Sequence, residues 1–389
     1  MINKIKEISK SIFEEIVEIR RHLHMYPELS FCEYNTSSYI KSILNKWNIP
    51  FTEGIAVNGI VVVLHGINKE KKTIALRADF DALPIKEEND IEYCSKNSGV
   101  MHACGHDAHT ASLLGVIRIL DSLKNDWEGS IKFIFQPAEE MLPGGAKQMI
   151  EEGVLDNPKV SKVIGQHVFP DLEVGKVGFL KGKYMASTDE IYIDVIGKGG
   201  HAALTDTYNN PIISASKLIN ELEIVFKQYR DIPCVLAFGF IEGRGSTNVI
   251  PNNVSIKGTL RVLDEKFRKQ AKKIIKQTVD SIAISNNLDI NLNICQGYPC
   301  LVNDESLTEN LIIFAKQYLG SDNVIELSLR MTGEDFAYFS QTVPSCFYRL
   351  GTSNVKNGIT AGLHTSTFNI DEKSLEIGMG LMAYLAINN

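Results

Sequence analysis

Strand-like and helix-like segments alternate through the first 170 residues, and this alternation limits the possible folds more than any other feature of the chain. Apolar runs typical of buried strands occupy 58–66, 72–85, 129–140 and 162–170. A helix is predicted over 107–123, between the second and the third of these runs. Strands that alternate with helices favour an α/β sheet that is mostly parallel.

Polar side chains follow these runs where the strands are expected to end. The third run is expected to stop as a strand at Pro137 and the fourth at Pro170, because proline cannot donate to a sheet ladder. The carboxyl ends of parallel strands meet at one edge of the sheet, where ligands gather. The side chains expected at that edge are Asp79, Asp81, Glu139, Glu140 and His167.

The middle of the chain follows a different order. Strand, helix, strand, strand, helix and strand are predicted in turn over 189–203, 210–226, 234–243, 253–263, 264–286 and 288–297. This order is typical of a ferredoxin-like α+β sandwich. Helices at 305–318 and 373–387 then return to α/β character. We therefore predict two domains, a mostly parallel α/β domain of residues 1–185 and 299–389 and an inserted ferredoxin-like domain of residues 186–298.

The composition excludes several classes of protein. The chain has 389 residues, of which 44% are hydrophobic and 22% charged, with a formal net charge of -7. This balance is typical of globular proteins and argues against a nucleic-acid partner. No apolar run approaches the roughly 18 residues of a membrane span, and the N-terminus lacks the features of a signal peptide. The seven cysteines form no CxxC pair, so we expect a reducing, cytoplasmic location.

Residues 100–110, VMHACGHDAHT, hold three of the nine histidines. Cys104 and His106 flank a glycine there, and two adjacent glutamates, Glu139 and Glu140, follow another strand. Like charges this close repel each other unless a cation lies between them or one of them is protonated. Thiolate, imidazole and carboxylate ligands together suit zinc, manganese, cobalt or nickel.

Each of these fragments also has a simpler interpretation. A lone His-x-x-x-His pair is usually a solvated helix face, two glutamates are consistent with a charged loop, and a cysteine in an apolar region is usually a core residue. His102 fits either a supporting contact near a metal or a structural role, and His109 is expected to pack or to support a ligand. The placement of all the fragments at strand ends is what favours a metal site.

Ten motifs occur in a fixed order along the chain. RRHLHMYPELSFCEYNTS is followed by LRADFDALPI, MHACGHDAHTA, FQPAEE with GGAKQMIEEG, GQHVFP, GKGGHAA, NVIP, GTLR, TGEDFAYF and LHTSTFNID. Over nearly its whole length the chain thereby resembles the zinc aminoacylase and carboxypeptidase-G-like amidohydrolases. The branch it resembles contains hippurate hydrolases, indole-acetyl-amino-acid hydrolases and N-acetyl-diaminopimelate deacetylases.

The resemblance implies a site for two divalent metal ions, which zinc, manganese, cobalt or nickel would fit. Cys104 takes the bridging place that an aspartate holds in the wider family. The remaining ligands of the family match His106, Glu140, His167 and His364.

The same resemblance implies the catalytic groups. Glu139 matches the general base that activates water at the metals and later protonates the leaving amine. Asp81 matches an aspartate that orients a ligand histidine, although here Asp79 stands in that histidine's own place. His201 matches a histidine of the inserted domain that in relatives reaches the partner subunit's site and stabilises the oxyanion. Two further positions match substrate contacts: Asn248 and Arg261.

The expected function is a metal-dependent amidohydrolase that cleaves N-acyl-L-amino acids, such as N-acetyl or N-benzoyl derivatives, to a carboxylate and a free amino acid. The alternatives are an N-acetyl-diaminopimelate deacetylase, a metallo-dipeptidase on the same scaffold and a catalytically silent binding protein. The resemblance also implies a catalytic α/β domain and an inserted dimerisation or lid domain, hence a homodimer or a higher homo-oligomer. No role follows for five nearby residues: Asp79, His102, His109, Glu334 and Asp335.

Overall fold

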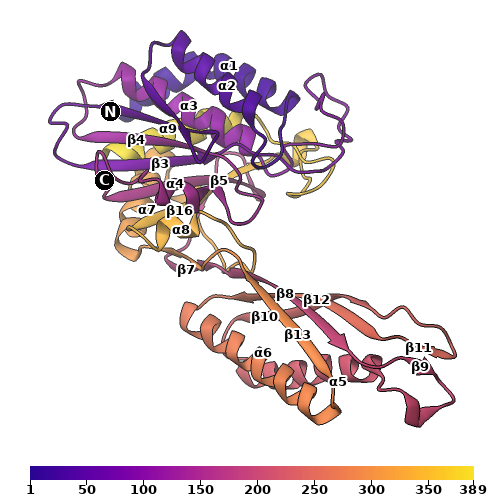
Figure 1. The fold of residues 1–389 in the computed structure, drawn as a ribbon. Helices are drawn as coiled ribbons and strands as arrows, with labels where there is room; N and C mark the ends of the chain where they lie inside the picture. Colours follow the sequence, from indigo (N-terminus) through magenta and orange to yellow (C-terminus); the bar gives the residue numbers. More distant parts are fainter. The chain divides into compact units, whose positions relative to one another are not determined.

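The computed structural model describes residues 1–389, which divide into two compact units (Figure 1). The first unit comprises Met1–Gly182, Val302–Ser328 and Asp335–Asn389, and the second comprises Lys183–Leu301 and Leu329–Glu334. The predicted domain boundaries differ from these units mainly at Leu329–Glu334. That segment lies with the second unit because its backbone accepts hydrogen bonds from the amide of Ala186.

An eight-stranded sheet forms the framework of the first unit, in the order β1-β2-β4-β3-β5-β16-β6-β15. Its central strands β4, β3, β5 and β16 are parallel, whereas β1, β2 and the β6/β16 pair add antiparallel contacts. The prediction of a mostly parallel sheet is therefore confirmed. The strand bounds are β1 (Phe51–Ile55), β2 (Gly59–His65), β3 (Thr73–Asp79), β4 (Ser130–Gln136), β5 (Lys162–Glu173), β6 (Val177–Phe179), β15 (Val324–Glu326) and β16 (Ser345–Ser353).

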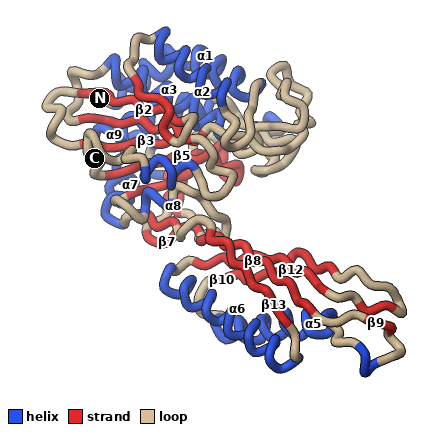
Figure 2. Tube along the Cα trace, viewed as in Figure 1, coloured by secondary structure: helices blue, strands red, loops and turns tan.

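Helices of the first unit cover this sheet (Figure 2). The helix α3 packs against α1, α9, β3 and β5, so its apolar residues are almost all buried in the main core. The helix α4 contacts β4 and α8, and α8 contacts β16. None of the helices combines the length and the apolar character that a membrane crossing requires. The helix bounds are α1 (Ile2–Met25), α2 (Tyr34–Lys46), α3 (His106–Ser122), α4 (Gly145–Glu151), α7 (Glu305–Leu319), α8 (Ala337–Ser340) and α9 (Lys373–Ile387).

The second unit has the predicted ferredoxin-like order of elements. Its four-stranded sheet has the order β10-β12-β8-β13, every neighbouring pair is antiparallel, and α5 and α6 pack on the sheet and on each other. The Asn210 and Asp264 side chains accept amide hydrogen bonds at the starts of α5 and α6, which fixes where both helices begin. The bounds are β8 (Ser187–Ile196), α5 (Pro211–Phe226), β10 (Cys234–Glu242), β12 (Asn253–Val262), α6 (Glu265–Asn286) and β13 (Asp289–Gln296).

Short elements complete the chain. The strands β9 (Gly200–His201) and β11 (Val249–Ile250) form a small antiparallel ladder in the second unit. The chain passes from one unit to the other within β7 (Gly182–Met185) and β14 (Leu301–Asn303). Four single turns of 3-10 helix are η1 (Thr205–Thr207), η2 (Lys227–Tyr229), η3 (Ser321–Asn323) and η4 (Val355–Asn357).

One strand prediction is wrong. The strand β5 does not end at Pro170 but continues to Glu173, so His167 lies in the middle of a strand and not at its end. The pairing between β5 and β16 is irregular around this proline. Gly351 pairs with Phe169, whereas Ser353, two positions later, pairs with Glu173, four positions later. A local bulge of this kind removes the need for a proline amide in the ladder.

A buried network of charges joins the end of α1 to the start of α3. The His24 Nδ1 atom lies 2.8 Å from Asp107 Oδ2, and its Nε2 atom lies 3.1 Å from Glu87 Oε1. Burial and the charge of Arg20 lower the pKa of His24, but the two carboxylates outweigh them and the net pKa is raised. The groups that face the ring are Arg20, Glu87, Tyr93, His102 and Asp107.

We expect His24→Gln to lower the free energy of unfolding by about 3 kcal/mol, because it leaves two buried carboxylates without a shared cation. The folded pKa of His24 lies above its usual 6.5, so its stabilisation is complete below that pH and is lost as the pH rises through the folded pKa. Urea unfolding at about pH 6 and about pH 9 should therefore show a larger effect at the lower pH.

The control for this prediction is His65→Gln, which alters an exposed imidazole at the end of β2. It should change the stability by about 1 kcal/mol or less. A His24→Gln penalty that is the same at both pH values would contradict a charged His24.

Candidate metal centre

Two parallel strands deliver carboxylates to one edge of the sheet. Asp79 at the end of β3 pairs with Gln136 at the end of β4, so the residues that follow both strands emerge together. Asp81 and Glu140 are joined directly, because the Glu140 amide donates to Asp81 Oδ2 at 2.9 Å. Ala138, between Pro137 and the two glutamates, has a φ of 54° and turns the chain sharply. The predicted convergence of acidic side chains at strand ends is therefore present.

The thiol and the first histidine come from a tight turn before α3. Gly105 separates Cys104 from His106 and has a φ of 81°, a conformation that favours glycine. A Cβ atom at Gly105 would lie 2.4 Å from the Val168 side chain, so this position also requires a residue without one. The turn thereby presents Cys104 and His106 together, next to the strand that carries His167.

The five residues predicted as metal ligands converge. The Cys104 Sγ atom lies 3.5 Å from His167 Nε2 and 3.3 Å from His364 Nε2. The Glu140 Oε1 atom lies 3.3 Å from His364 Nε2 and 3.9 Å from His106 Nε2. These residues fall into overlapping groups, and in each group the donor atoms all lie within 4.8 Å of one another. Sulfur, nitrogen and oxygen donors at this spacing fit divalent metal ions.

Hydrogen bonds leave one nitrogen of His106 and one of His167 available to a metal. His106 Nδ1 lies 3.1 Å from Asp81 Oδ1, while its Nε2 atom is buried without a hydrogen-bond partner. His167 Nδ1 donates to the carbonyl of Val168 at 2.7 Å, which leaves Nε2 facing Cys104. Metal-binding histidines commonly have such a partner on the second nitrogen. Asp81 thus orients a histidine, and that histidine is His106.

His109 has a supporting position. Its Nε2 atom accepts a hydrogen bond from the Val168 amide at 2.9 Å, so its Nδ1–H donates to Asp79 Oδ1 at 2.6 Å. Both ring nitrogens are occupied, and His109 is not a free ligand. Asp79 is in turn paired with Arg77, which also donates to Asp335 at 2.7 Å. Through these contacts, His109 connects Asp79 of β3 with Val168 of β5 next to the predicted metal ligands.

Negative charge is concentrated at this edge. Burial, Glu140 and Glu139 raise the pKa of the Cys104 thiol well above its usual value. Burial lowers the pKa of His106, but Asp79 and Asp81 outweigh it and raise that pKa to about 10. Both shifts have the same cause, an excess of anionic groups, and a bound cation would relieve it.

Glu139 lies beside the ligand groups and is only 6% exposed. Its Oε1 atom accepts a hydrogen bond from the amide of Asp335 at 3.3 Å. The Asp335 carboxylate is held by the Gln136 side chain and by the amide of Ala146. The carboxylate predicted to be the general base is therefore held by Asp335, which is in turn fixed by buried partners on β4 and α4.

His364 reaches the site from the far end of the sequence. It is separated from Cys104 by 260 positions, and its amide donates to the Ala103 carbonyl at 2.8 Å. Its φ of 60° directs the ring back towards Cys104 and Glu140. The side chain is 52% exposed, which marks the side of the centre that solvent can reach.

The other predicted site residues lie in the second unit, and they are not all together. His201 in β9 pairs with Val249, and Asn248 accepts the Ala202 amide, so His201 and Asn248 are neighbours at one end of the unit. Arg261 pairs with Thr188, at the other end of β12, and its Nε donates to Thr259. Arg261 lies eight positions after Asn253 in the same strand, a distance of about 26 Å. Glu334 also belongs to the second unit.

His102 makes no hydrogen bond to any of the predicted metal ligands. It is buried, neither ring nitrogen has a hydrogen-bond partner, and burial lowers its pKa to about 4. A neutral, buried imidazole next to the ligand turn fits a structural position.

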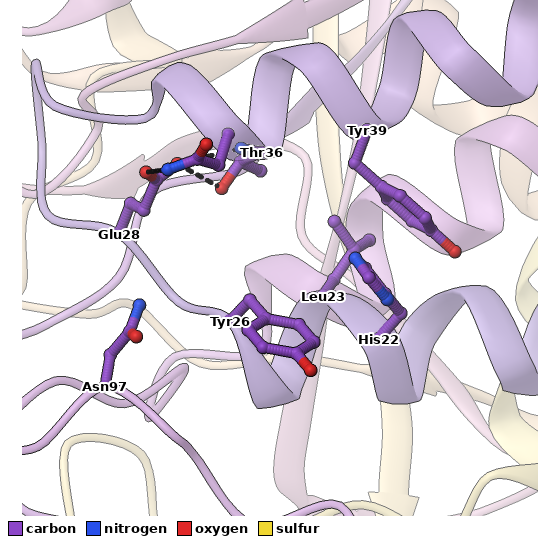
Figure 3. Close-up of a pocket in the computed structure, with 8 residues that line it drawn as sticks. His22, Leu23, Tyr26, Glu28, Thr36, Tyr39 and Asn97 are labelled. Atoms are coloured by element: carbon purple, nitrogen blue, oxygen red, sulfur yellow. Dashed lines mark hydrogen bonds between the residues drawn. The ribbon is translucent and has the colours of Figure 1, made fainter.

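A cavity of about 290 Å³ lies apart from the predicted ligands, between the end of α1 and the start of α2 (Figure 3). The His22 ring stacks on Tyr39 beside it, with ring centroids 3.7 Å apart. Glu28 at its rim accepts hydrogen bonds from Asn35 and Thr36, so this carboxylate anchors the start of α2. The cavity contains none of the residues predicted for catalysis or metal binding.

Sequence reasoning missed two residues that contact the site from the segment before α2. The Ser30 hydroxyl donates to Asp81 Oδ2 at 2.6 Å, and Glu33 accepts the amide of Ala138 at 2.9 Å. Both residues belong to the first of the ten motifs. Membership in that motif is the only feature of the sequence that connects them with the site. A single serine or glutamate in a loop has no spacing pattern that assigns it a partner.

Comparison with known proteins decides the family. A model of peptidase family M20/M25/M40 matches residues 75–388. The chain belongs to peptidase family M20/M25/M40. The family resemblance inferred from the ten motifs is thereby confirmed.

Individual M20 relatives match most of the chain. The N-acetyl-L-cysteine deacetylase of Bacillus subtilis is 38% identical over 364 residues, which cover 93% of this chain and 85% of that protein. The N-acetyldiaminopimelate deacetylase of Lactobacillus acidophilus is 36% identical over 378 residues, 94% of this chain and 95% of that protein. The crystal structure of the Bacillus subtilis YXEP protein, described as a dinuclear metal binding peptidase, has a TM-score of 0.84 at 31% identity and covers 97% of this chain and 98% of that one.

In this M20 protein, we expect Gly105→Ala to weaken metal binding and to lower the free energy of unfolding by about 1–3 kcal/mol. The left-handed backbone and the contact with Val168 both oppose a Cβ atom at that position. Metal titration and urea unfolding measure the two effects.

The matched control is Gly99→Ala. Gly99 has the same φ of 81°, but a Cβ atom there would have no neighbouring atom within 4 Å, so this variant keeps the backbone strain without the clash. Gly99→Ala should leave metal affinity unchanged. Equal metal affinity in both variants would show that the Gly105 turn does not set the ligand positions.

Proposed function

We propose that this protein is a metal-dependent amidohydrolase that cleaves N-acyl-L-amino acids to a carboxylate and a free amino acid. The observation that carries the proposal is the convergence of Cys104, His106, Glu140, His167 and His364 with a buried Glu139 beside them. The two named relatives are both deacetylases of N-acetyl amino acids. An intact ligand set and an intact Glu139 disfavour a catalytically silent binding protein.

Cys104, His106, Glu140, His167 and His364 would hold two divalent ions. The His106 Nε2 atom, which makes no hydrogen bond, and the excess of anionic groups fit such ions. Bound metal ions polarise an amide carbonyl and lower the pKa of water. Zinc, manganese, cobalt and nickel all suit this donor set.

Glu139 accepts the proton of the attacking water and delivers it to the leaving nitrogen. The Asp335 amide holds the Glu139 carboxylate in place, and Asp81 holds both the His106 ring and the backbone of Glu140. These contacts fix the base and two ligands relative to each other, which is what proton transfer over hydrogen-bonding distance requires. The burial of Glu139 keeps competing water away from the carboxylate.

The chemistry of the second unit supports this substrate class. Arg261 presents a guanidinium that suits the free carboxylate of an amino-acid product. N-acetyl, N-benzoyl and N-acetyl-diaminopimelate substrates all carry such a carboxylate, and so does a dipeptide. We favour an N-acyl substrate over a dipeptide because the named relatives remove acetyl groups. Cys104 must remain reduced to bind metal, and all seven cysteines are unpaired, so we infer a cytoplasmic location.

We further propose a homodimer formed through the second unit. The strand β10 is an edge of its sheet and, with α5, exposes a set of large apolar residues that a partner would cover: Ile212, Ile213, Ile224, Val235, Phe240 and Ile241. Arg261 and Asn253 lie at opposite ends of β12, about 26 Å apart, and His201 and Asn248 lie towards the Asn253 end. One second unit therefore does not bring all three to a single substrate, and a second copy would supply His201 and Asn248.

Glu139→Gln should abolish hydrolysis, by at least about 1,000-fold in kcat, while the bound metal is retained. Turnover is measured with N-acetyl-L-cysteine, N-acetyl-diaminopimelate, N-benzoylglycine and an unacylated dipeptide, after loading with each of the four metals. No turnover of any N-acyl substrate by metal-loaded wild-type protein would refute the function. An active Glu139→Gln variant would refute only the assignment of the base.

His201→Ala should lose most activity without unfolding, since the oxyanion loses a donor. Mixing this variant with Glu139→Gln, after subunit exchange, should restore roughly a quarter of the wild-type activity, because half of the dimers are then mixed and each mixed dimer has one intact site. The separate variants are the controls. A mixture as inactive as its components would place His201 in its own subunit's site.

A further inference from the structure

We propose that the segment between α1 and α2, residues 27–33, sets the position of the catalytic turn and that Glu33 is a positioning residue for Glu139. The inference rests on the proposed function for the role of Glu139. It gives a role to the first of the ten sequence motifs, which contains none of the residues proposed to bind metal or substrate.

One side of this segment is bound to the residues after β3. Leu29 forms a parallel bridge with Ala82, whose amide donates to the Glu28 carbonyl at 2.8 Å. The Ser30 hydroxyl donates to Asp81, the residue that orients His106. The segment therefore runs alongside one of the two strand ends that build the centre.

The other side of the segment reaches the second strand end through Glu33. The Glu33 side chain is 0% exposed, and its Oε1 atom accepts the amides of Ala138 at 2.9 Å and Phe31 at 3.0 Å. Its Oε2 atom accepts the Asn58 side-chain amide at 2.9 Å. A buried carboxylate with three donors is held in one place and cannot move without leaving those donors unpaired.

The contact with Ala138 matters because of where Ala138 stands. It directly precedes Glu139, and its φ of 54° is a conformation that an alanine adopts only when its surroundings impose it. Glu33 holds the amide of Ala138, and the Gly145 amide donates to the carbonyl of Ala138 at 2.9 Å. Both polar groups of this residue are thereby fixed, and the direction in which the chain presents Glu139 is fixed with them.

The same segment offers a control for a purely structural effect. Glu28 is also a carboxylate with several donors, but its side chain binds only Asn35 and Thr36 at the start of α2 (Figure 3). Glu28→Ala should lower the thermal midpoint of unfolding because a helix start loses its anchor. It should leave kcat unchanged, since none of these partners contacts the metal centre.

The experiment compares Glu33→Ala, Glu33→Gln and Glu28→Ala with wild type, all full length and loaded with manganese. In Glu33→Ala we expect kcat to fall about 10- to 100-fold with KM within about twofold and with the bound metal retained. Glu33→Gln keeps one acceptor for the Ala138 amide, so its kcat should lie between those of Glu33→Ala and wild type. Hydrogen–deuterium exchange of residues 137–141 should be faster in Glu33→Ala but unchanged in Glu28→Ala.

A kcat of the Glu33 variants equal to that of Glu28→Ala would overturn the inference. So would a loss of metal that accounts for the lost activity, because Glu33 would then act on the ligands and not on Glu139. If Glu33→Ala fails to fold, Glu33→Gln decides by the same measurements. If the wild-type protein hydrolyses no N-acyl substrate, the proposed function fails, and unchanged exchange at residues 137–141 would by itself overturn the positioning role.

Discussion

Mutual repulsion among buried acidic groups is the constraint on which the centre of the first unit depends. Asp79, Asp81, Glu139 and Glu140 come from the ends of two neighbouring parallel strands, and Cys104 adds a thiol that burial would otherwise keep neutral. Arg77 pairs with Asp79, and His106, whose raised pKa favours its charged form, faces both Asp81 and Glu140. Bound divalent ions would supply further positive charge. They would relieve the repulsion among the acidic groups and so stabilise the folded centre.

Hydrogen bonds within the protein orient the histidine rings of that centre without a bound ion. His106, His167 and His109 each give one ring nitrogen to a different acceptor, a carboxylate, a backbone carbonyl and a second carboxylate. The first two keep the other nitrogen for a ligand role, whereas His109 uses both of its nitrogens to fasten strands together. Buried partners in β3, in β5 and directly after β3 thus determine the orientation of the rings.

The parts of this arrangement that sequence could predict are those with a local pattern. Strand periodicity and Pro137 predicted where β4 ends, and parallel topology then implied that Asp81 and Glu140 would meet. His167 was placed wrongly at a strand end because the irregular register opposite Pro170 depends on β16, which is distant in sequence. Glu33 and Ser30 could not be paired in advance, because their partners are set by tertiary packing that leaves no repeat in the sequence. The roles of His201, Asn248 and Arg261 remain predictions.

The long separation between His364 and the other ligands has a consequence for synthesis of the protein. Domains fold as the chain emerges from its N-terminus, yet the residue that approaches both Cys104 and Glu140 follows Cys104 by 260 positions. A chain that ends after β5 contains Cys104 and Glu140 but not this closing residue. The helix α9 also follows His364 in the sequence and packs against α1 and α3 in the main core, so a chain that ends before His364 would lack this ligand group and part of the core together.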